Sequence, residues 1–273
     1  MLETDFIPLG TSHLVAIVCT FLITTTIYYI TTKNERVCKK LREIHLIWIL
    51  TLALIGVHLA FVVYCLKSGL TGLEYLLPLH TCELSMFLLV AYCLTERKPQ
   101  IQKHITYILY YWLMLGGIVS LFMPDTFGFG FPHFIFIQTF IYHGLQLIIG
   151  VYITASQKVQ LPAFSILVAY SALLVVLPFV ALVDSKIDGA NYMFLNENVE
   201  GIFSFINAYQ FGPIRLLIMS ICVLLAFSIL WICYWLLAIL RSRLSSRPNS
   251  IKKPRSLSCT RTSRNFLSRK THE

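Results

Sequence analysis

Long apolar stretches alternate with short polar segments along most of this chain. Seven stretches reach the length of about 20 residues that a helix needs to cross the hydrocarbon core of a bilayer. They predict transmembrane helices over residues 12–32, 45–66, 76–95, 104–123, 133–154, 162–183 and 214–240. The pattern therefore predicts an all-α, polytopic membrane protein, with a seven-helix transmembrane domain over residues 1–240 and a polar segment over 241–273.

Composition excludes an ordinary soluble domain. Hydrophobic residues make up 57% of the chain and charged residues only 13%, whereas soluble domains average about 25% charged residues. The mean hydropathy of +0.72 agrees with this assignment.

Lysine and arginine are unevenly divided between the two predicted sides. Nineteen of the 22 basic residues fall in the segments 33–43, 95–103, 155–161 and 241–273, all on one side, while Lys67 and Lys186 lie on the other and Arg215 stands at the edge of the seventh span. Positive loops are retained in the cytosol. We therefore expect an outer or luminal N-terminus and a cytosolic C-terminus.

The segment from residue 241 carries ten basic residues, eight serines and a single carboxylate, and it accounts for most of the net charge of +9. Such a sequence predicts a disordered cytosolic tail that binds anionic lipid head groups, an attraction that serine phosphorylation would weaken. The alternative is a solvated topology signal with no further role. Neither interpretation implies a nucleic-acid partner.

Six of the eight cysteines lie in predicted spans, and Cys38 and Cys259 face the predicted cytosol. No predicted outer loop contains a cysteine, so a disulfide framework is not expected.

The third span contains His80, Cys82 and Glu83, and ionisable groups inside a bilayer are expensive enough that their default interpretation is functional. His80 and Glu83 are three residues apart and therefore neighbours on a helix surface. With a rise of about 1.5 Å per residue, Cys82 is expected roughly 9 Å below the outer surface.

The fifth span places His133, Phe136, Phe140 and His143 within about 80° of one another at 100° per residue. We expect this face to point into the bundle. His143 is expected roughly 15 Å deeper than His133, at a depth comparable to that of Cys82.

Further polar groups gather at the same predicted end: His58 in the second span, Asp125 after the fourth and Arg215 at the start of the seventh. Between the sixth and seventh spans, residues 184–213 form a loop long enough to suggest a function. Its segments 191–195 and 201–206 could cap a pocket, the latter as a re-entrant or interfacial segment.

Cysteine and histidine together form a simple set for acyl transfer. An imidazole takes the thiol proton, and the thiolate attacks an ester to form a thioester that passes its acyl group on. Cys82 is the predicted nucleophile and His143 its base, with Glu83, Asp125 or His80 as orienting groups. The alternatives are that Cys82 is simply a small apolar residue, and that the histidines only form hydrogen bonds between helices. An unpaired Glu83 would have to be protonated, or paired with His80 or Arg215.

Several motifs together resemble the YwaF-like family of integral membrane proteins. They are Leu77-Pro78-Leu79-His80-Thr81-Cys82, the segment 117–125, Phe131-Pro132-His133-Phe134 with Gln138 and His143-Gly144, and Asn191-Tyr192-Met193-Phe194-Leu195, within residues 75–215. Animal members look like phospholipid acyltransferases with a cysteine and a histidine, which the resemblance places at Cys82 and His143. Many bacterial members have no assigned activity. Where the family often continues with Gly-Pro-Trp-Pro, this chain reads Gly212-Pro213-Ile214-Arg215.

The sequence thus predicts an integral membrane acyltransferase or lipase-like enzyme that acts on phospholipids and lysophospholipids in the outer or luminal leaflet, without a cofactor or metal. Its expected substrate contacts are His80, Glu83, Asp125, His133, Asn191, Tyr192 and Arg215.

Two rival functions remain open. A receptor or transporter of a small or lipidic ligand fits the seven spans, although the receptor motifs Asp-Arg-Tyr and Asn-Pro-x-x-Tyr are lacking and seven spans divide poorly into repeats. A metal or haem site could use His58, His80, His133 and His143, although no HxxxH or HExxH spacing occurs.

Overall fold

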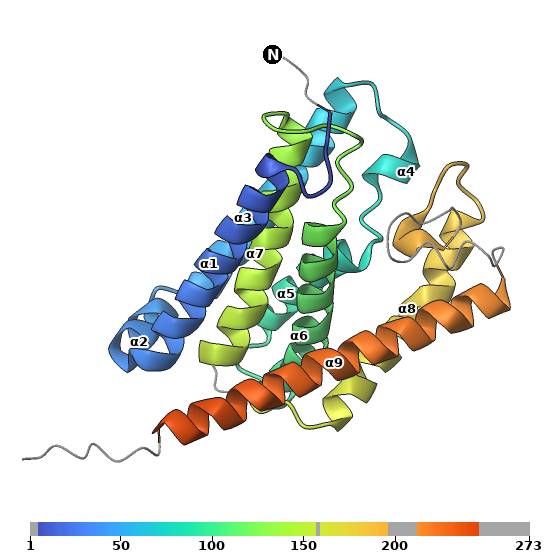
Figure 1. The fold of residues 1–273 in the computed structure, drawn as a ribbon. Coiled ribbons are helices and arrows are strands. Elements are labelled where there is room, and N and C mark those ends of the chain that lie inside the picture. The colour runs from blue at the N-terminus through green and yellow to red at the C-terminus, as the bar shows by residue number, and fades with distance from the viewer. Residues whose placement is uncertain (1–4, 157–158, 196–211, 246–273) are drawn as a thin grey trace, which may run out of the picture. The chain divides into compact units, whose positions relative to one another are not determined.

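The computed structural model describes residues 5–156, 159–195 and 212–245. This part of the chain is all-α, and no β-sheet forms within it (Figure 1). Its helices are α1 (Thr11–Lys33), α2 (Glu35–Glu43), α3 (Leu46–Lys67), α4 (Leu73–Leu76), α5 (Thr81–Leu94), α6 (Pro99–Phe122), α7 (Phe134–Ser156), α8 (Phe164–Asp184), the 3₁₀ turn η1 (Tyr192–Phe194) and α9 (Pro213–Ser245).

Six helices in the described residues are long and apolar enough to cross a membrane: α1, α3, α6, α7, α8 and residues 214–240 of α9. Large apolar side chains point outward from them; Val175 on α8, for example, is 77% exposed. Such surfaces suit lipid rather than water, and the chain is a multi-pass integral membrane protein. The direction in which the termini face stays a prediction.

The continuous helix expected over residues 76–95 is not formed. In its place, the four-residue helix α4 leads into an extended segment, and the 14-residue helix α5 follows. At about 1.5 Å per residue α5 is roughly 21 Å long, shorter than the roughly 30 Å hydrocarbon core. The third predicted crossing is therefore a broken element.

Pro78 explains the break. A residue before proline is disfavoured in the helical region, and Leu77 adopts extended angles (φ −77°, ψ 127°). His80 is also extended (φ −70°, ψ 153°) and directly precedes α5. Non-helical backbone at membrane depth is tolerated where protein covers it, and Leu77 and Leu79 pack against the buried cluster that includes Tyr192 and Met193.

Glycines let helices approach α7 closely. A Cβ added at Gly117 of α6 would lie 2.7 Å from Leu147, and one added at Gly144 of α7 would lie 3.3 Å from Thr20 of α1. Small residues at such crossings are typical of membrane helix packing, where close backbone approach replaces the hydrophobic driving force. In Figure 1, α1 and α3 lie alongside α7.

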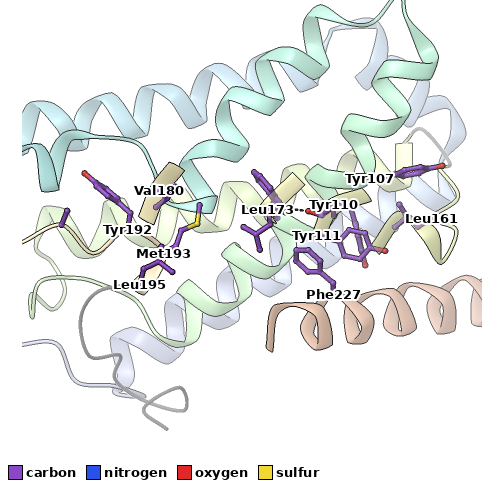
Figure 2. Packing of buried hydrophobic residues seen from close by; sticks show 13 residues of the cluster. Tyr107, Tyr110, Tyr111, Leu161, Leu173, Val180, Tyr192, Met193, Leu195 and Phe227 are labelled. Atoms are coloured by element: carbon purple, nitrogen blue, oxygen red, sulfur yellow. Dashed lines mark hydrogen bonds between the residues drawn. The ribbon is translucent and has the colours of Figure 1, made fainter. Parts of the chain in front are cut away.

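Aromatic residues join α6, α8 and the first part of α9 in a second core region (Figure 2). The hydroxyl of Tyr111 is 2.8 Å from that of Ser165, and its ring centroid is 5.0 Å from that of Phe227. The hydroxyl of Tyr110 donates to the carbonyl of Leu230. These contacts join the part of α9 up to residue 234 to the unit that contains the site.

The segment 33–43, expected as a loop, contains the helix α2. Asn34 caps it by accepting a hydrogen bond from the N–H of Val37. Arg42 donates to the carbonyl of Ser156 at the end of α7 (3.0 Å). The Asn34 cap therefore begins a short helix where the sequence predicts a polar connection.

The chain divides into two units, residues 1–234 and 235–273, and every site residue discussed below belongs to the first. The half-apolar segment 201–206 and the basic tail from residue 246 lie outside the described residues. The predicted domain boundary at residue 240, the tail's disorder and its binding to anionic lipid remain predictions.

Candidate active site

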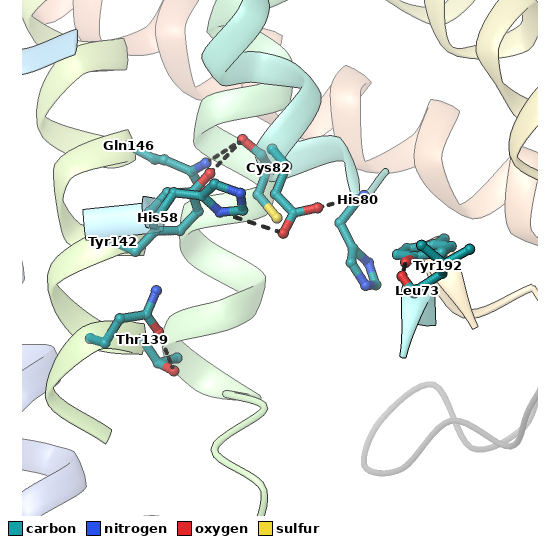
Figure 3. Close-up of polar contacts among 10 residues, drawn as sticks. His58, Leu73, His80, Cys82, Thr139, Tyr142, Gln146 and Tyr192 are labelled. Carbon is teal, nitrogen blue, oxygen red and sulfur yellow. Dashed lines mark hydrogen bonds and ion pairs between the residues drawn. The ribbon is translucent and has the colours of Figure 1, made fainter. Parts of the chain in front are cut away.

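The first turn of α5 begins well inside the bundle. The carbonyl of Cys82 lies level with Gln146, about 18 Å along α7 from its start at Phe134, because the Gln146 amide donates to it at 2.7 Å. The hydroxyl of Tyr142, one helical turn earlier, also points to this carbonyl (3.4 Å; Figure 3). Two side chains of α7 thus position the turn that contains Cys82.

Glu83 closes this turn and joins it to α3. Its Oε2 accepts a hydrogen bond from the backbone N–H of His80 at 3.1 Å, the acidic half of a capping box. Its Oε1 lies 3.8 Å from Nδ1 of His58, with the two side chains only 14% and 10% exposed (Figure 3). The sequence predicts that Glu83 is protonated or paired with His80 or Arg215. In the structure its carboxylate accepts from the backbone N–H of His80 and lies near the His58 ring.

Two adjacent glycines of α6 bring Cys82 and His143 to the same level. A Cβ at Gly117 would lie 3.1 Å from the carbonyl oxygen of His143. A Cβ at Gly116 would lie 3.7 Å from Cys82 Cβ and 3.7 Å from Gln146 Oε1, which is ordinary contact. Gly117 therefore permits the close approach of α6 and α7, and Gly116 lies beside Cys82 and Gln146, where a Cβ would be accepted in ordinary contact.

His143 is unusual because neither of its buried ring nitrogens has a hydrogen-bond partner within the described residues. Its ring lies against that of Tyr142, with centroids 5.3 Å apart. No hydrogen bond links it to the Cys82 sulfur. A buried polar group normally has a partner, so His143 has two vacant hydrogen-bonding positions at the level of the cysteine.

His80 contacts the segment that contains η1. Its Nδ1 accepts from the backbone N–H of Met193 at 3.3 Å, and its ring contacts those of Tyr192 and Phe194. Met193 and Phe194 adopt left-handed backbone angles (φ 55° and 59°), which non-glycine residues adopt only at a cost. The histidine thus docks a tightly turned loop onto the start of α5.

Tyr192 joins this loop to α4 and α8. Its hydroxyl donates to the carbonyl of Leu73 at 2.6 Å, and its N–H donates to Asp184 at 3.0 Å. Burial raises the pKa of Tyr192 to about 12, so the hydroxyl keeps the proton that it donates. In this arrangement the Tyr192 hydroxyl forms a structural bond, and its substrate contact stays a prediction.

The other predicted site residues are distributed around these elements. Arg215 is buried and donates to the carbonyl of Phe194 (3.1 Å), and Asn191 accepts through its carbonyl from the N–H of Phe194. Asp125 accepts from the N–H of Phe127 in an exposed turn. His133 stacks on Phe129 and contacts Tyr64 before the start of α7. Asp125 and His133 are not brought to Cys82.

Metal ligation finds no support in the geometry of the described residues. No three of their histidine, cysteine, aspartate and glutamate side chains converge on a common point. All cysteines of this part are free thiols. His58 and His80, two of the proposed ligands, are engaged with Glu83 and Met193.

A sequence profile described as the TMEM164 family matches residues 8–232, most of the chain and all of the site. The chain belongs to the TMEM164 family. No curated protein and no solved structure was found to match it. The resemblance to YwaF-like proteins remains a prediction beside this assignment.

In this TMEM164 family member, sequence reasoning passed over the residues that complete the site. Gln146 has no spacing that distinguishes it from other polar residues in a membrane helix, yet it binds the Cys82 carbonyl. Gly117 begins the motif segment 117–125 and Gly116 directly precedes it, but sequence reasoning assigns neither glycine a role. Adjacent glycines in an apolar stretch are a packing signal, and here they mark the crossing at the cysteine and histidine.

Proposed function

We propose that this protein is an integral membrane acyltransferase that uses a Cys82 thioester and His143 as general base. One observation carries the proposal: both nitrogens of a buried histidine are vacant at the level of a cysteine in the first turn of a helix that starts inside the bundle. Catalytic hydrogen bonds are often long or absent before substrate binds, so the vacant imidazole suits a base that engages the thiol in the substrate complex.

In the proposed first step, His143 accepts the Cys82 thiol proton and the thiolate attacks the carbonyl carbon of a phospholipid ester. A sulfur–carbon bond forms, and the carbonyl electron pair moves to oxygen. When that pair returns, the carbon–oxygen bond to glycerol breaks, and the leaving oxygen takes the proton from His143. The products are a thioester on Cys82 and a lysophospholipid.

In the second step a hydroxyl of an acceptor lysophospholipid gives its proton to His143 and attacks the thioester carbon. The carbon–sulfur bond breaks, and the thiolate recovers the proton. Apolar helices surround the site, and limited access of water favours transfer to a lipid over hydrolysis. The reaction requires no cofactor.

The contacts of the neighbouring residues support positioning roles for them. Glu83, His80, Tyr192 and Arg215 contact one another or the backbone, and they hold the start of α5 and the turn η1 in place. They are therefore proposed as positioning residues, whereas contact with the reacting ester falls to Cys82 and His143.

The test is transfer of a labelled acyl chain. Purified protein is placed in vesicles of labelled dioleoyl phosphatidylcholine with lysophosphatidylethanolamine, and labelled phosphatidylethanolamine is measured. Wild type should form it, while Cys82→Ala and His143→Ala should not.

Cys93→Ala and His104→Ala are matched controls. Cys93 is a buried thiol of the same helix that faces Thr51. His104 is an exposed histidine of α6 that contacts the carbonyl of Gln100. Both variants should retain transfer. Transfer by Cys82→Ala at the wild-type rate would contradict the proposal. A folded wild-type protein that transfers no acyl chain would favour a binding or transport role.

A further inference from the structure

The helix α2 lies at the membrane surface because of its two neighbours in the chain. α1 ends at Lys33 and α3 begins at Leu46, and both helices are long and apolar enough to cross a bilayer. α2 contacts both of them and lies beside the end of α1 in Figure 1. The helix therefore stays at the level where the two spans leave the hydrocarbon core, whichever leaflet that is.

The two faces of α2 differ in chemistry and in exposure. Val37, Cys38 and Leu41 fall within about 100° of one another on the helix, and they are buried or half-buried against the protein. An apolar face on the protein with charged residues opposite is typical of a helix that lies in the membrane interface. The basic face of α2 consists of its exposed basic residues, Arg36, Lys39, Lys40 and Arg42.

The basic face carries charge that the described protein does not neutralise. Residues 33–43 contain five basic and two acidic residues. Lys39 pairs with Glu43 at 3.7 Å, but Arg36 and Lys40 form no ion pair within the described residues. These two lie four residues apart, and like charges at that spacing destabilise a helix. An external anion would remove the repulsion.

Arg42 adds a donor that is held in place. One of its guanidinium N–H groups donates to the carbonyl of Ser156 at the end of α7 (3.0 Å), and a guanidinium has five such groups. The side chain is exposed, so N–H groups that do not bind Ser156 are accessible from outside. A planar guanidinium that is always charged suits the binding of a phosphate group through two parallel hydrogen bonds.

We propose that the basic face of α2 binds the head groups of anionic phospholipids in the leaflet at that level. Lipid phosphates accept hydrogen bonds from Arg42 on one side of the face and from Arg36 and Lys40 on the other. Phosphatidylcholine carries the same phosphate, but its own cation cancels the charge, so the face favours phosphatidylserine over phosphatidylcholine. The binding does not depend on acyl transfer at Cys82.

The experiment locates bound lipid on full-length protein by photo-crosslinking. Nanodiscs of dioleoyl phosphatidylcholine and dioleoyl phosphatidylserine present the same lipids to both ends of the protein, and they contain a trace of a diazirine lipid with one head group or the other. Mass spectrometry of protein fragments gives the yield of each probe at residues 33–48. Wild type should favour the phosphatidylserine probe there, and Cys82→Ala should keep this preference.

The double variant Arg36→Gln with Lys40→Gln removes two charges and keeps polar side chains that suit a helix. Since each basic residue near a membrane surface contributes roughly a fivefold preference for anionic lipid, the variant should lower the ratio of the two yields about 5- to 30-fold. Lys67→Gln with Lys186→Gln removes two exposed charges elsewhere in the chain. It is the matched control and should leave the ratio at residues 33–48 unchanged.

Equal yields of the two probes at residues 33–48 of wild type would overturn the inference, and so would an unchanged ratio in Arg36→Gln with Lys40→Gln. Adducts of the phosphatidylserine probe confined to residues 246–273 would assign anionic lipid to the basic tail alone and would also overturn it. Loss of the preference on addition of inorganic phosphate would identify a site for free phosphate instead of lipid. If hydrogen exchange shows that the double variant loses α2, the same ratio in Lys40→Gln decides the question.

Discussion

The two sides of the first turn of α5 differ in how their polar groups are used. On the side of α3 and η1, Glu83 binds the N–H of His80 and lies beside His58, and His80 receives the N–H of Met193. On the side of α7, His143 has two buried nitrogens and Gln146 a buried oxygen without a partner in the described chain. The groups named on the first side are engaged, and those on the other side have capacity for a ligand.

Residues that support the fold and residues proposed to react therefore lie within a few positions of one another. Buried networks that are fully paired stabilise one arrangement, whereas an unpaired buried group costs free energy. Unpaired groups persist where function requires them. Substitutions on the paired side should therefore reduce stability, and substitutions on the unpaired side should reduce activity.

The largest expected effect comes from the unpaired side. His143→Leu should slow acyl adduct formation about 10²- to 10⁴-fold, the usual contribution of a general base. Its midpoint of thermal unfolding in detergent should stay equal or rise, because the variant removes a buried group with no partner. A large fall of the midpoint would show that His143 supports the fold, and the two sides of the turn would then not differ in the way described.

Glu83→Ala should have the opposite effect. It removes the cap of α5 and leaves His58 without its carboxylate, so we expect a loss of about 2–3 kcal/mol in the free energy of unfolding. Glu83→Gln keeps an acceptor for the His80 N–H and should lose less. Denaturation in mixed micelles measures both variants, and equal stabilities for wild type and Glu83→Ala would refute the role of the cap.

The two glycines of α6 offer a sharper version of the same contrast. Gly117→Ala places a Cβ 2.7 Å from Leu147, and such overpacking should cost about 1–3 kcal/mol. Gly116→Ala meets only ordinary contacts and should unfold like wild type, whereas Gly116→Leu places a larger side chain against Cys82 and should block acylation. Gly56→Ala, where a Cβ meets nothing within 4 Å, controls for helix propensity.

The smallest effect is expected at the turn η1. Tyr192→Phe removes the hydrogen bond to the Leu73 carbonyl and should cost about 1 kcal/mol of unfolding free energy. The rate of acylation at Cys82 should stay within a few-fold of wild type. A rate that falls by orders of magnitude while stability is unchanged would place the Tyr192 hydroxyl at the substrate instead.

Much of the fold could be predicted because it follows from continuous apolar length. Six spans correspond to helices. α6 begins at Pro99 and not at residue 104, α9 continues to Ser245 beyond residue 240, and the other ends agree within two residues. The predicted span 76–95 is the one that does not form a continuous helix. It contains Pro78 and His80, where the chain is still apolar but cannot continue a helix. Hydropathy reports the ability to enter lipid and carries little information on backbone breaks.

The site could be predicted only in part. Composition and spacing indicated Cys82 and His143, and they included Phe136 and Phe140 in one face with His143. In the structure Phe136 and Phe140 pack beside α1, with Phe140 next to His13, and the residues that reach Cys82 come from the neighbouring strip, Tyr142 and Gln146. Which strip meets which helix depends on how closely α6 and α7 approach each other at Gly117, and no periodicity encodes that approach.

The most direct test of the account is the mass of the intact protein after a quenched reaction with labelled dioleoyl phosphatidylcholine vesicles, followed by fragmentation to locate the adduct. We predict an acyl group on Cys82 that hydroxylamine removes, absent from Cys82→Ala and retained in Cys93→Ala. An acyl group that maps to another cysteine, or an identical adduct on Cys82→Ala, would contradict the central claim.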